Sequence, residues 1–162
     1  MFVFDTSVFI NGWNDHYQPP AFDELWAFVG TAMEDGRVIA PREVRREIER
    51  HTDALATWAK GCYFVDPSPE VQAVVGQIQE SYRDQFDRPG RNDADPWVIA
   101  HAKETGFCVV TYEGREFSGR RAALRPRNPK MPDICAAVGV DCVNPSTALN
   151  RLGVRVTLNR PL

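Results

Sequence analysis

The 162-residue chain has the length of one compact domain, so we expect a single domain over residues 1–162. Its content of 43% hydrophobic, 10% aromatic and 25% charged residues argues against intrinsic disorder, and its net charge of -3 gives no overall attraction for nucleic acid. No apolar stretch approaches the roughly 20 residues of a membrane-spanning helix, and the apolar start Met1–Phe4 lacks the features of a signal peptide. We therefore expect a cytoplasmic protein without a membrane partner.

Short apolar runs alternate with helical patterns along the chain, which is typical of βαβ units around a parallel sheet. Strands are expected at Phe2–Phe4, Val38–Ile39, Tyr63–Val65, Phe107–Val110 and Asp141–Val143. Helices are expected at Ala21–Met33, Pro41–His51 and Asp53–Lys60, from about Ser68 to about Phe86, and from Asp95 onward. The alternating residues Val154–Leu158 are expected to form an edge strand or a tail. The expected fold class is α/β with a mainly parallel sheet.

Five acids lie close to the ends of these elements. Asp5 follows the first strand, Glu47 lies in the second helix, Asp93 and Asp95 precede another helix, and Glu113 follows the strand that ends at residue 110. The carboxyl ends of parallel strands converge at one edge of an open α/β sheet, so acids far apart in sequence can meet there. Carboxylates bind hard divalent cations, and this pattern therefore indicates metal-assisted hydrolysis.

Each acid also has an ordinary structural explanation. Asp5 is suited to cap the helix that follows it, and Asp95 or Asp93 is suited to cap the helix that begins at Pro96. Glu47 has arginine neighbours on its helix with which it can form a salt bridge. Glu113 is an acid of a kind common on protein surfaces.

Cysteine and histidine give little support for a zinc site. The four cysteines show no CxxC spacing, and we expect reduced thiols in the core. The three histidines form no pair at metal-ligand spacing on one helix. The expected metal chemistry is that of oxygen ligands.

One segment is strongly basic although the whole chain is acidic. A single acid, Glu116, stands there among the basic residues Arg115, Arg120, Arg121, Arg125, Arg127 and Lys130. Such a segment can contact phosphates, because the local field and counterion release act at the contact surface. The alternative is a solvated loop. Its place directly after Glu113 adds weight to contact with RNA without deciding between the two, and the candidate contacts are Arg115, Arg120, Arg121 and Arg125.

Taken together, these motifs resemble the PIN-domain nucleases, including VapC-like ribonuclease toxins, over nearly the whole chain. The matching segments are Asp5–Ser7, Pro41–Ile48, Asp95–Ala102 and Val109–Glu113, and the later Lys130–Cys135 resembles an uncharacterised PIN-like branch. The order and spacing of the motifs carry the resemblance, because each motif alone is weak.

The resemblance implies a Rossmann-like three-layer α/β/α sandwich, dependence on Mg²⁺ or Mn²⁺, and cleavage of RNA phosphodiester bonds. Asp5, Glu47 and Asp95 match the metal-binding acids of the family, and Glu113 takes the place of a fourth acid that is often Asp. Asp93 is an alternative metal ligand. Ser7 and Thr111 are expected to orient ligands or water.

The resemblance also implies the toxin role in a toxin-antitoxin pair, with an antitoxin protein as partner. Aromatic residues near Trp13, Tyr17, Phe22 and Trp26 are expected either to form a dimer or antitoxin surface or to pack between helices. Two other functions stay open. One is a PIN-like RNA- or protein-binding module without catalysis, and the other is a metal-dependent phosphatase with Asp5 as nucleophile, although Ser7 stands where such enzymes commonly have a second acid.

Overall fold

A four-stranded, entirely parallel sheet forms the centre of the part of the chain that the structure describes. The structure is a computed structural model that describes residues 1–51, 53–86, 93–114 and 129–157. The strands are β1 (Phe2–Phe4), β2 (Val38–Ile39), β3 (Cys108–Val110) and β4 (Cys142–Val143), in the order β2-β1-β3-β4. β1 pairs with both β2 and β3, so it lies inside the sheet. The expected parallel α/β fold is confirmed.

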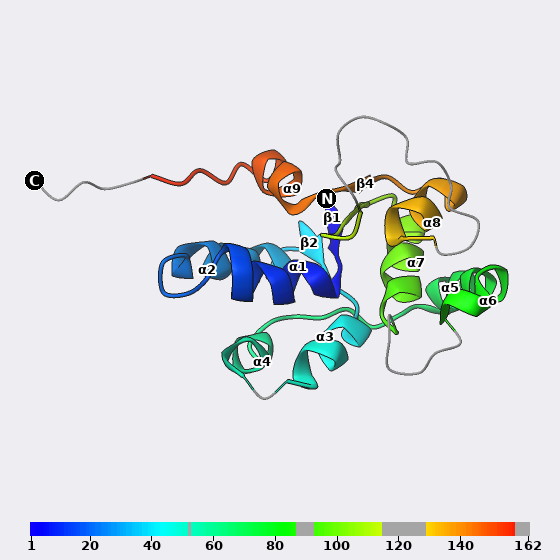
Figure 1. The fold of residues 1–162 in the computed structure, drawn as a ribbon, viewed down its shortest axis with the longest axis horizontal. Coiled ribbons are helices and arrows are strands. Elements are labelled where there is room, and N and C mark those ends of the chain that lie inside the picture. Colours follow the sequence, from blue (N-terminus) through cyan, green and yellow to red (C-terminus); the bar gives the residue numbers. More distant parts are fainter. Residues whose placement is uncertain (52, 87–92, 115–128, 158–162) are drawn as a thin grey trace, which may run out of the picture.

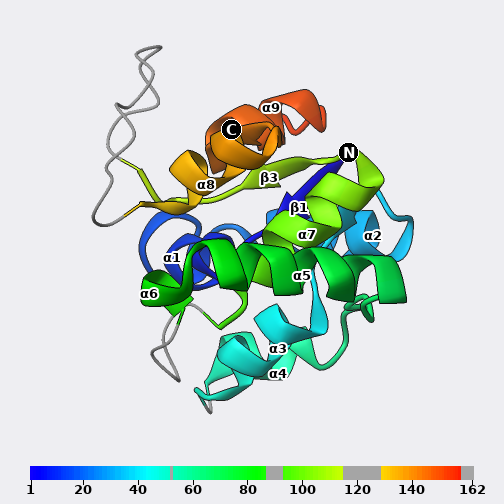
Figure 2. The same ribbon diagram turned by 90° about the vertical axis from the view of Figure 1, so that its right-hand side faces the viewer.

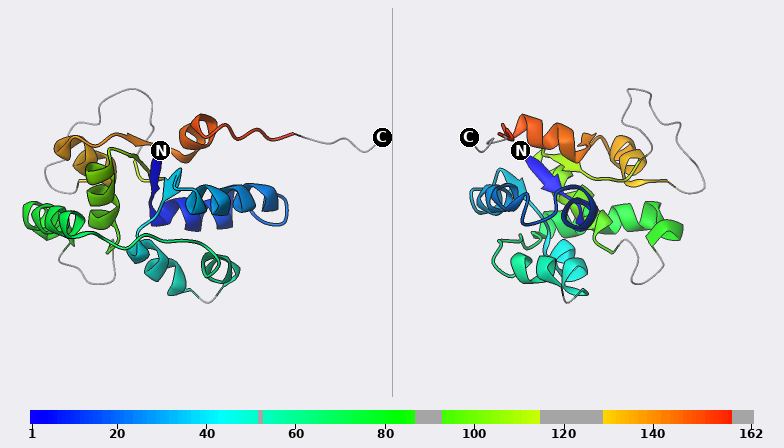
Figure 3. Two further views of the ribbon diagram at one scale, coloured as in Figure 1. Left: turned by 180° about the vertical axis from the view of Figure 1, so that it is seen from behind. Right: turned by 60° about the vertical axis from the view of Figure 1, so that its left-hand side comes forward.

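Helices cover both faces of this sheet. Figures 1 and 3 show α2 on one side of the strands and α7, with α5 outside it, on the other. This is the Rossmann-like three-layer α/β/α arrangement. The helical elements are α1 (Thr6–Asn11), the π-helix η1 (Gly12–His16), α2 (Asp23–Glu34), α3 (Arg42–Glu49), α4 (Ala54–Ala59), α5 (Pro69–Ser81), α6 (Arg83–Phe86), α7 (Asp95–Thr105), α8 (Met131–Val138) and α9 (Pro145–Arg151).

The strands are short, continuous apolar runs because both faces of the sheet are covered. All three residues of β1 are buried, and β3 ends in two fully buried valines. Gly106 and Gly139 end α7 and α8 in the left-handed conformation, at φ 71° and 78°, which glycine adopts without steric cost. These two glycines turn the chain from a helix into the strand that follows.

Two expected elements differ from the structure, and for a third the sequence allows either an edge strand or a tail. The strand expected at Tyr63–Val65 is reduced to one parallel bridge between Val65 and Pro41, and Tyr63 is 61% exposed. The long helix expected to reach about Phe86 is interrupted at Tyr82, whose φ of -125° and ψ of 39° are not helical. Residues 154–157 form no strand, and residue 158 lies outside the described residues.

The carboxyl ends of the two central strands bring several distant segments together. The backbone amide of Asp5 donates to the carbonyl of Val110 at 3.0 Å, which joins the residues that follow β1 and β3. Helix α3 packs against α1, and Figures 1 and 2 show α3 and the start of α7 near this edge of the sheet. The expected site acids lie on these segments. No helix in the described part of the chain is long and apolar enough to cross a membrane.

Candidate functional site

Asp5 is a buried carboxylate at the carboxyl end of β1. It is 3% exposed, and its Oδ2 accepts hydrogen bonds from Ser7 Oγ at 2.6 Å and Thr111 Oγ1 at 2.8 Å. Asp5 occupies the N-cap position of α1 but makes no side-chain capping bond to that helix. Helix capping therefore does not explain this aspartate, and the two hydroxyl groups hold its carboxylate in one orientation.

The same hydroxyl groups connect Asp5 to the segment after β3. Thr111 is fully buried, and its Oγ1 accepts from the backbone amide of Glu113 at 2.9 Å. Ser7 Oγ accepts from the backbone amide of Tyr112 at 3.0 Å and lies 3.2 Å from Thr111 Oγ1. Both residues expected to orient ligands thus lie against Asp5.

Glu47 reaches from α3 to the segments that carry the other acids. Its Oε2 accepts from Thr6 Oγ1 at 2.5 Å, and its Oε1 accepts from the backbone amide of Ala94 at 3.0 Å. Thr6 and Ala94 directly neighbour Asp5 and Asp95 in sequence, so Glu47 joins α1 to the start of α7. Thr6, which the motif Asp5–Ser7 offered as an alternative to Ser7 for orienting Asp5, bonds to Glu47 instead, and nothing in the sequence pointed to Ala94.

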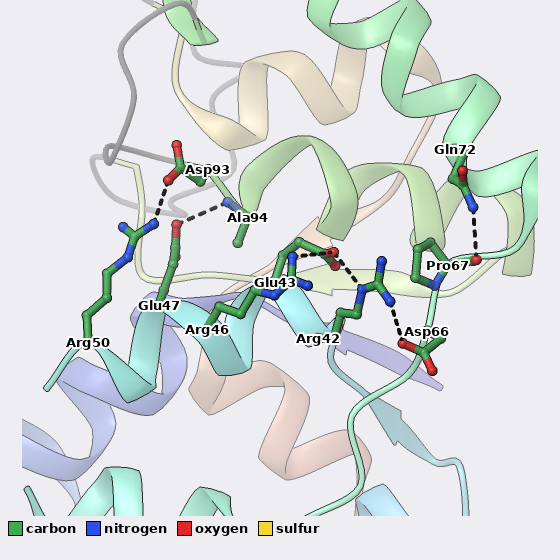
Figure 4. A network of polar contacts seen from close by, with 10 residues as sticks. All are labelled: Arg42, Glu43, Arg46, Glu47, Arg50, Asp66, Pro67, Gln72, Asp93 and Ala94. Atoms are coloured by element: carbon green, nitrogen blue, oxygen red, sulfur yellow. Dashed lines mark hydrogen bonds and ion pairs between the residues drawn. The ribbon is translucent and has the colours of Figure 1, made fainter. Parts of the chain in front are cut away.

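The arginines expected to compete for Glu47 pair with other acids. Figure 4 shows Arg50 directed to Asp93, with 2.6 Å between Arg50 Nη2 and Asp93 Oδ2. Arg46 Nη1 lies 3.7 Å from Glu43 Oε1. Among the described residues, no arginine or lysine forms a salt bridge with Glu47, and Asp93, an alternative metal ligand, pairs with Arg50.

Asp95 is the first residue of α7 and is 9% exposed. The N-cap residue is Ala94, and no side chain caps this helix, so neither Asp95 nor Asp93 has the capping role. Burial raises the pKa of Asp95 to about 9, and the negative charges of Asp5, Glu113 and Glu47 act in the same direction. The charge effects show that these four acids, here called the acid group, lie near one another.

Asp5 is also harder to ionise than an ordinary aspartate. Burial is the largest cause and raises its pKa to about 6, while the hydrogen bonds from Ser7 and Thr111 act in the opposite direction. The negative charge of Glu113 raises it further. Two buried members of the acid group therefore favour a proton, or another positive charge, in their surroundings.

Glu113 is held by the start of α8. Its Oε2 accepts from the backbone amide of Met131 at 3.0 Å, and its Oε1 lies 3.9 Å from Lys130 Nζ. The positive charge of Lys130 also lowers the pKa of Asp95. Lys130 belongs both to the basic segment and to the motif Lys130–Cys135, and neither pattern predicted its pairing with Glu113.

The donor atoms and charges of the acid group fit a hard divalent cation. In the described ranges, no group of three or more His, Cys, Asp or Glu side chains is arranged closely enough to hold a metal ion as it stands. The described residues make no hydrogen bond to the Asp95 carboxyl group, and neighbouring acids repel its charge. A cation bound by carboxylate oxygens would relieve that repulsion, and oxygen donors suit Mg²⁺ and Mn²⁺.

Two other expectations concern residues away from the acid group. Arg115, Arg120, Arg121 and Arg125, expected to contact RNA, lie outside the described residues. Of the two alternatives for the aromatic residues, packing between helices is what the structure shows: they pack against the hydrophobic core, with Trp13 and Trp26 ring centroids 4.9 Å apart and Tyr17 and Phe22 centroids 5.5 Å apart.

Comparison with known proteins gives one family. The model of the family described as Domain of unknown function (DUF4411) matches residues 2–156, a range that contains the whole acid group. No curated protein matches the chain.

Proposed function

We propose that this chain, which belongs to the DUF4411 family, is a metal-dependent ribonuclease that hydrolyses RNA phosphodiester bonds with Mg²⁺ or Mn²⁺. The observation that carries the proposal is that four acids converge at the carboxyl edge of the sheet. Asp5 and Asp95 are buried, Glu47 bonds to their sequence neighbours Thr6 and Ala94, and Thr111 bonds both to Asp5 and to the amide of Glu113. Burial and the charges of the other three acids raise the pKa of Asp95. Acids gathered in this way destabilise a folded chain through burial and mutual repulsion. Such groups cluster at functional sites, where this cost accompanies a chemical role. The order of the motifs, which resembles that of the PIN-domain nucleases, supports hydrolysis of RNA in particular.

Each member of the acid group has a separate anchor for holding a cation. Hydroxyl groups orient Asp5, the bonds to Thr6 and Ala94 orient Glu47, and the amide of Met131 orients Glu113. Asp95 lacks such a bond to the described residues, so its carboxylate is available to a cation. A divalent cation supplies positive charge that stabilises the phosphorane-like transition state and lowers the pKa of the attacking water.

Lys130 offers a positive charge at the edge of the acid group. Its side chain is 52% exposed and lies 3.9 Å from Glu113, which leaves the ammonium group accessible to a phosphate oxygen. In hydrolysis, water attacks the phosphorus atom and the bond from phosphorus to the leaving oxygen breaks. Lys130 is placed to attract the anionic phosphate toward the carboxylates, which by themselves would repel it.

The test is cleavage of a mixed pool of structured and single-stranded RNA in Mg²⁺, Mn²⁺ or EDTA. We expect the wild type to cut only with metal, and Asp5→Asn and Asp95→Asn to lose cleavage. Asp66→Asn is the matched control, because Asp66 is an exposed acid bonded to Arg42 outside the acid group. A folded protein that binds RNA but never cuts it would favour the binding-module alternative, and cleavage of small phosphate esters alone would favour the phosphatase.

We also propose, on the resemblance alone, that the nuclease is the toxin of a toxin-antitoxin pair. Expression of the wild type should then arrest growth, whereas expression of Asp95→Asn should not. A small protein encoded next to this chain should relieve the arrest. Equal growth with wild type and variant, in cells shown to contain active nuclease, would contradict the toxin role.

A further inference from the structure

An exposed histidine is stacked on a tyrosine beside the acid group. The ring centroids of His16 and Tyr112 are 4.7 Å apart, and the two rings are nearly parallel at 14°. His16 is an exposed residue, whereas Tyr112 is half-buried. Tyr112 packs against one face of the imidazole, and the histidine side chain remains exposed to solvent.

The backbone of Tyr112 is tied to the acid group. Its amide donates to Ser7 Oγ at 3.0 Å, and the same Ser7 hydroxyl donates to Asp5. The residues on either side of Tyr112 are Thr111, which donates to Asp5, and Glu113, a member of the acid group. The His16–Tyr112 stack is therefore held next to the carboxylates rather than on an unrelated surface.

An unusual helical turn brings His16 to this place. His16 is the last residue of the π-helix η1, whose turn is closed by a hydrogen bond from the amide of Tyr17 to the carbonyl of Gly12 at 2.6 Å. Gly12 allows the turn to lie against Trp26, because a Cβ atom at position 12 would stand 3.3 Å from the Trp26 ring. π-helical turns are rare and are found frequently at functional sites.

Tyr112 is a firm support for the histidine ring. Its pKa is raised above its usual range by burial, with a smaller effect from the neighbouring Tyr17. Tyr17 itself packs edge-on against Phe22. The tyrosine under His16 is thus half-buried and is held at its backbone by Ser7.

We infer that His16, supported by Tyr112, is a stacking platform for a nucleobase of single-stranded RNA next to the phosphate that is cut. This inference rests on the proposed ribonuclease function. Unpaired bases of single-stranded RNA stack on exposed aromatic side chains, histidine included, whereas bases inside a duplex are already stacked. A platform beside the acid group would hold the chain on one side of the cut while leaving the phosphate free to enter.

Binding of single-stranded RNA oligonucleotides tests the inference without depending on catalysis. Asp95→Asn protein is used in Mg²⁺ to prevent cleavage, and fluorescence anisotropy measures the affinity for one labelled oligonucleotide and for versions that each lack a single base. We expect removal of one particular base to weaken binding about 5- to 150-fold, which corresponds to the roughly 1–3 kcal/mol of one base stack. His16→Ala, combined with Asp95→Asn, should weaken binding of the intact oligonucleotide by a similar factor. In this double variant, removal of the same base should cause no further loss of affinity.

Two further variants separate stacking from a structural role of the histidine. His16→Phe keeps an aromatic face and should retain most of the affinity. Asn14→Ala, a change at an exposed residue of the same π-helix, should leave binding and its dependence on the base unchanged. The platform would be overturned if base removal weakened binding as much in His16→Ala as in the protein that keeps His16. It would also be overturned if His16→Phe bound RNA as poorly as His16→Ala.

The outcomes distinguish this inference from the proposed function. Binding that depends on His16 in a protein that never cuts RNA would support the platform and contradict the ribonuclease. Cleavage by the wild type, together with binding that is unchanged in His16→Ala, would support the ribonuclease and contradict the platform. Binding of no oligonucleotide by any form of the protein would overturn the platform.

Discussion

At the scale of single residues, Asp95 is a side chain whose surroundings strongly oppose its charge. Burial and three nearby carboxylates raise its pKa from the ordinary value near 4 to about 9. The folded protein without metal therefore keeps a proton on this group at pH values where the unfolded chain has lost it. Stability is linked to this difference in bound protons.

The sign of the pH dependence follows from that linkage. A carboxyl group whose pKa is raised in the folded state contributes to the free energy of unfolding. This contribution is complete at pH values below the pKa of the unfolded state and is lost as pH rises through the pKa of the folded state. We expect the free energy of unfolding of the metal-free wild type to fall between about pH 4 and about pH 9, and Asp5, with a pKa of about 6, adds a fall in the lower part of this range. Urea unfolding in EDTA at a series of pH values measures it. Asp95→Asn should show a flatter dependence, and parallel curves for the two proteins would contradict the assignment.

Thr111 is a second residue whose role can be separated from its size. Its hydroxyl donates to Asp5 and accepts from the amide of Glu113, and the residue is fully buried. Thr111→Val keeps the shape but leaves the amide of Glu113 without this acceptor and leaves Asp5 with only the bond from Ser7, which should lower the free energy of unfolding by about 1–3 kcal/mol. RNA cleavage should fall about 10- to 100-fold, the usual effect of losing a group that orients a metal ligand. Chemical denaturation and initial cleavage rates measure the two effects.

Thr111→Ser is the matched control for that variant. Serine keeps the hydroxyl group and should recover most of the cleavage rate while losing only the contacts of one methyl group. Loss of cleavage in Thr111→Ser equal to that in Thr111→Val would show that packing, not the bond to Asp5, is what matters.

At the scale of elements, α3 has its position set partly by its buried stripe and partly by Glu47. Val44 and Ile48 are fully buried, and Glu47 bonds to Thr6 at the start of α1 and to Ala94 before α7. One side chain thus connects three segments that are far apart in sequence. A structural role and a catalytic role for Glu47 predict different behaviour in two variants.

Glu47→Ala removes the acceptor for both bonds, and we expect the free energy of unfolding to fall by about 1–3 kcal/mol. Glu47→Gln keeps one acceptor oxygen for the amide of Ala94, and the Thr6 hydroxyl can turn to accept from the new amide group. Glutamine should therefore restore most of the stability but none of the metal-dependent cleavage. Thermal unfolding and RNA cleavage of both variants measure this difference, and a fully active Glu47→Gln would exclude Glu47 as a metal ligand.

The elements themselves were predicted well where the pattern is local. The four strands of the sheet were expected within one residue of their observed limits, because each is an apolar run bounded by turn residues. The strand expected at Tyr63–Val65 was wrong, since an apolar run forms a strand only where a neighbour offers backbone partners, and here only Val65 meets Pro41. The break at Tyr82 was missed because no glycine or proline marks it.

At the scale of the whole molecule, the acid group collects residues from four separate parts of the fold. They follow β1, lie in α3, begin α7 and follow β3. A cation bound among them would bind the folded state and not the separated segments of the unfolded chain, so it should stabilise the fold by mass action. This stabilisation is independent of any substrate.

We expect Mg²⁺ or Mn²⁺ at about 100 times its dissociation constant to add about 2.7 kcal/mol to the free energy of unfolding. For a chain of this size, that corresponds to a rise in Tm of roughly 5–10 °C. Scanning calorimetry with metal and with excess EDTA measures the rise, which Asp66→Asn should retain and Asp95→Asn should lose. A Tm that saturating metal leaves unchanged would contradict a cation site in the acid group.

The sequence by itself determined the parallel α/β class and placed the acids at the ends of elements, because apolar runs, helical stripes and turn residues are local patterns. Only the tertiary structure decided which partners those acids take. Asp93 turns to Arg50, Glu47 bonds to Thr6 and Ala94, and Lys130 meets Glu113. Such pairings depend on how crossover connections fold distant segments together and on which donors then compete for each carboxylate. The His16–Tyr112 stack has the same origin, because these two residues are far apart in sequence and meet only through the fold, at one edge of the sheet.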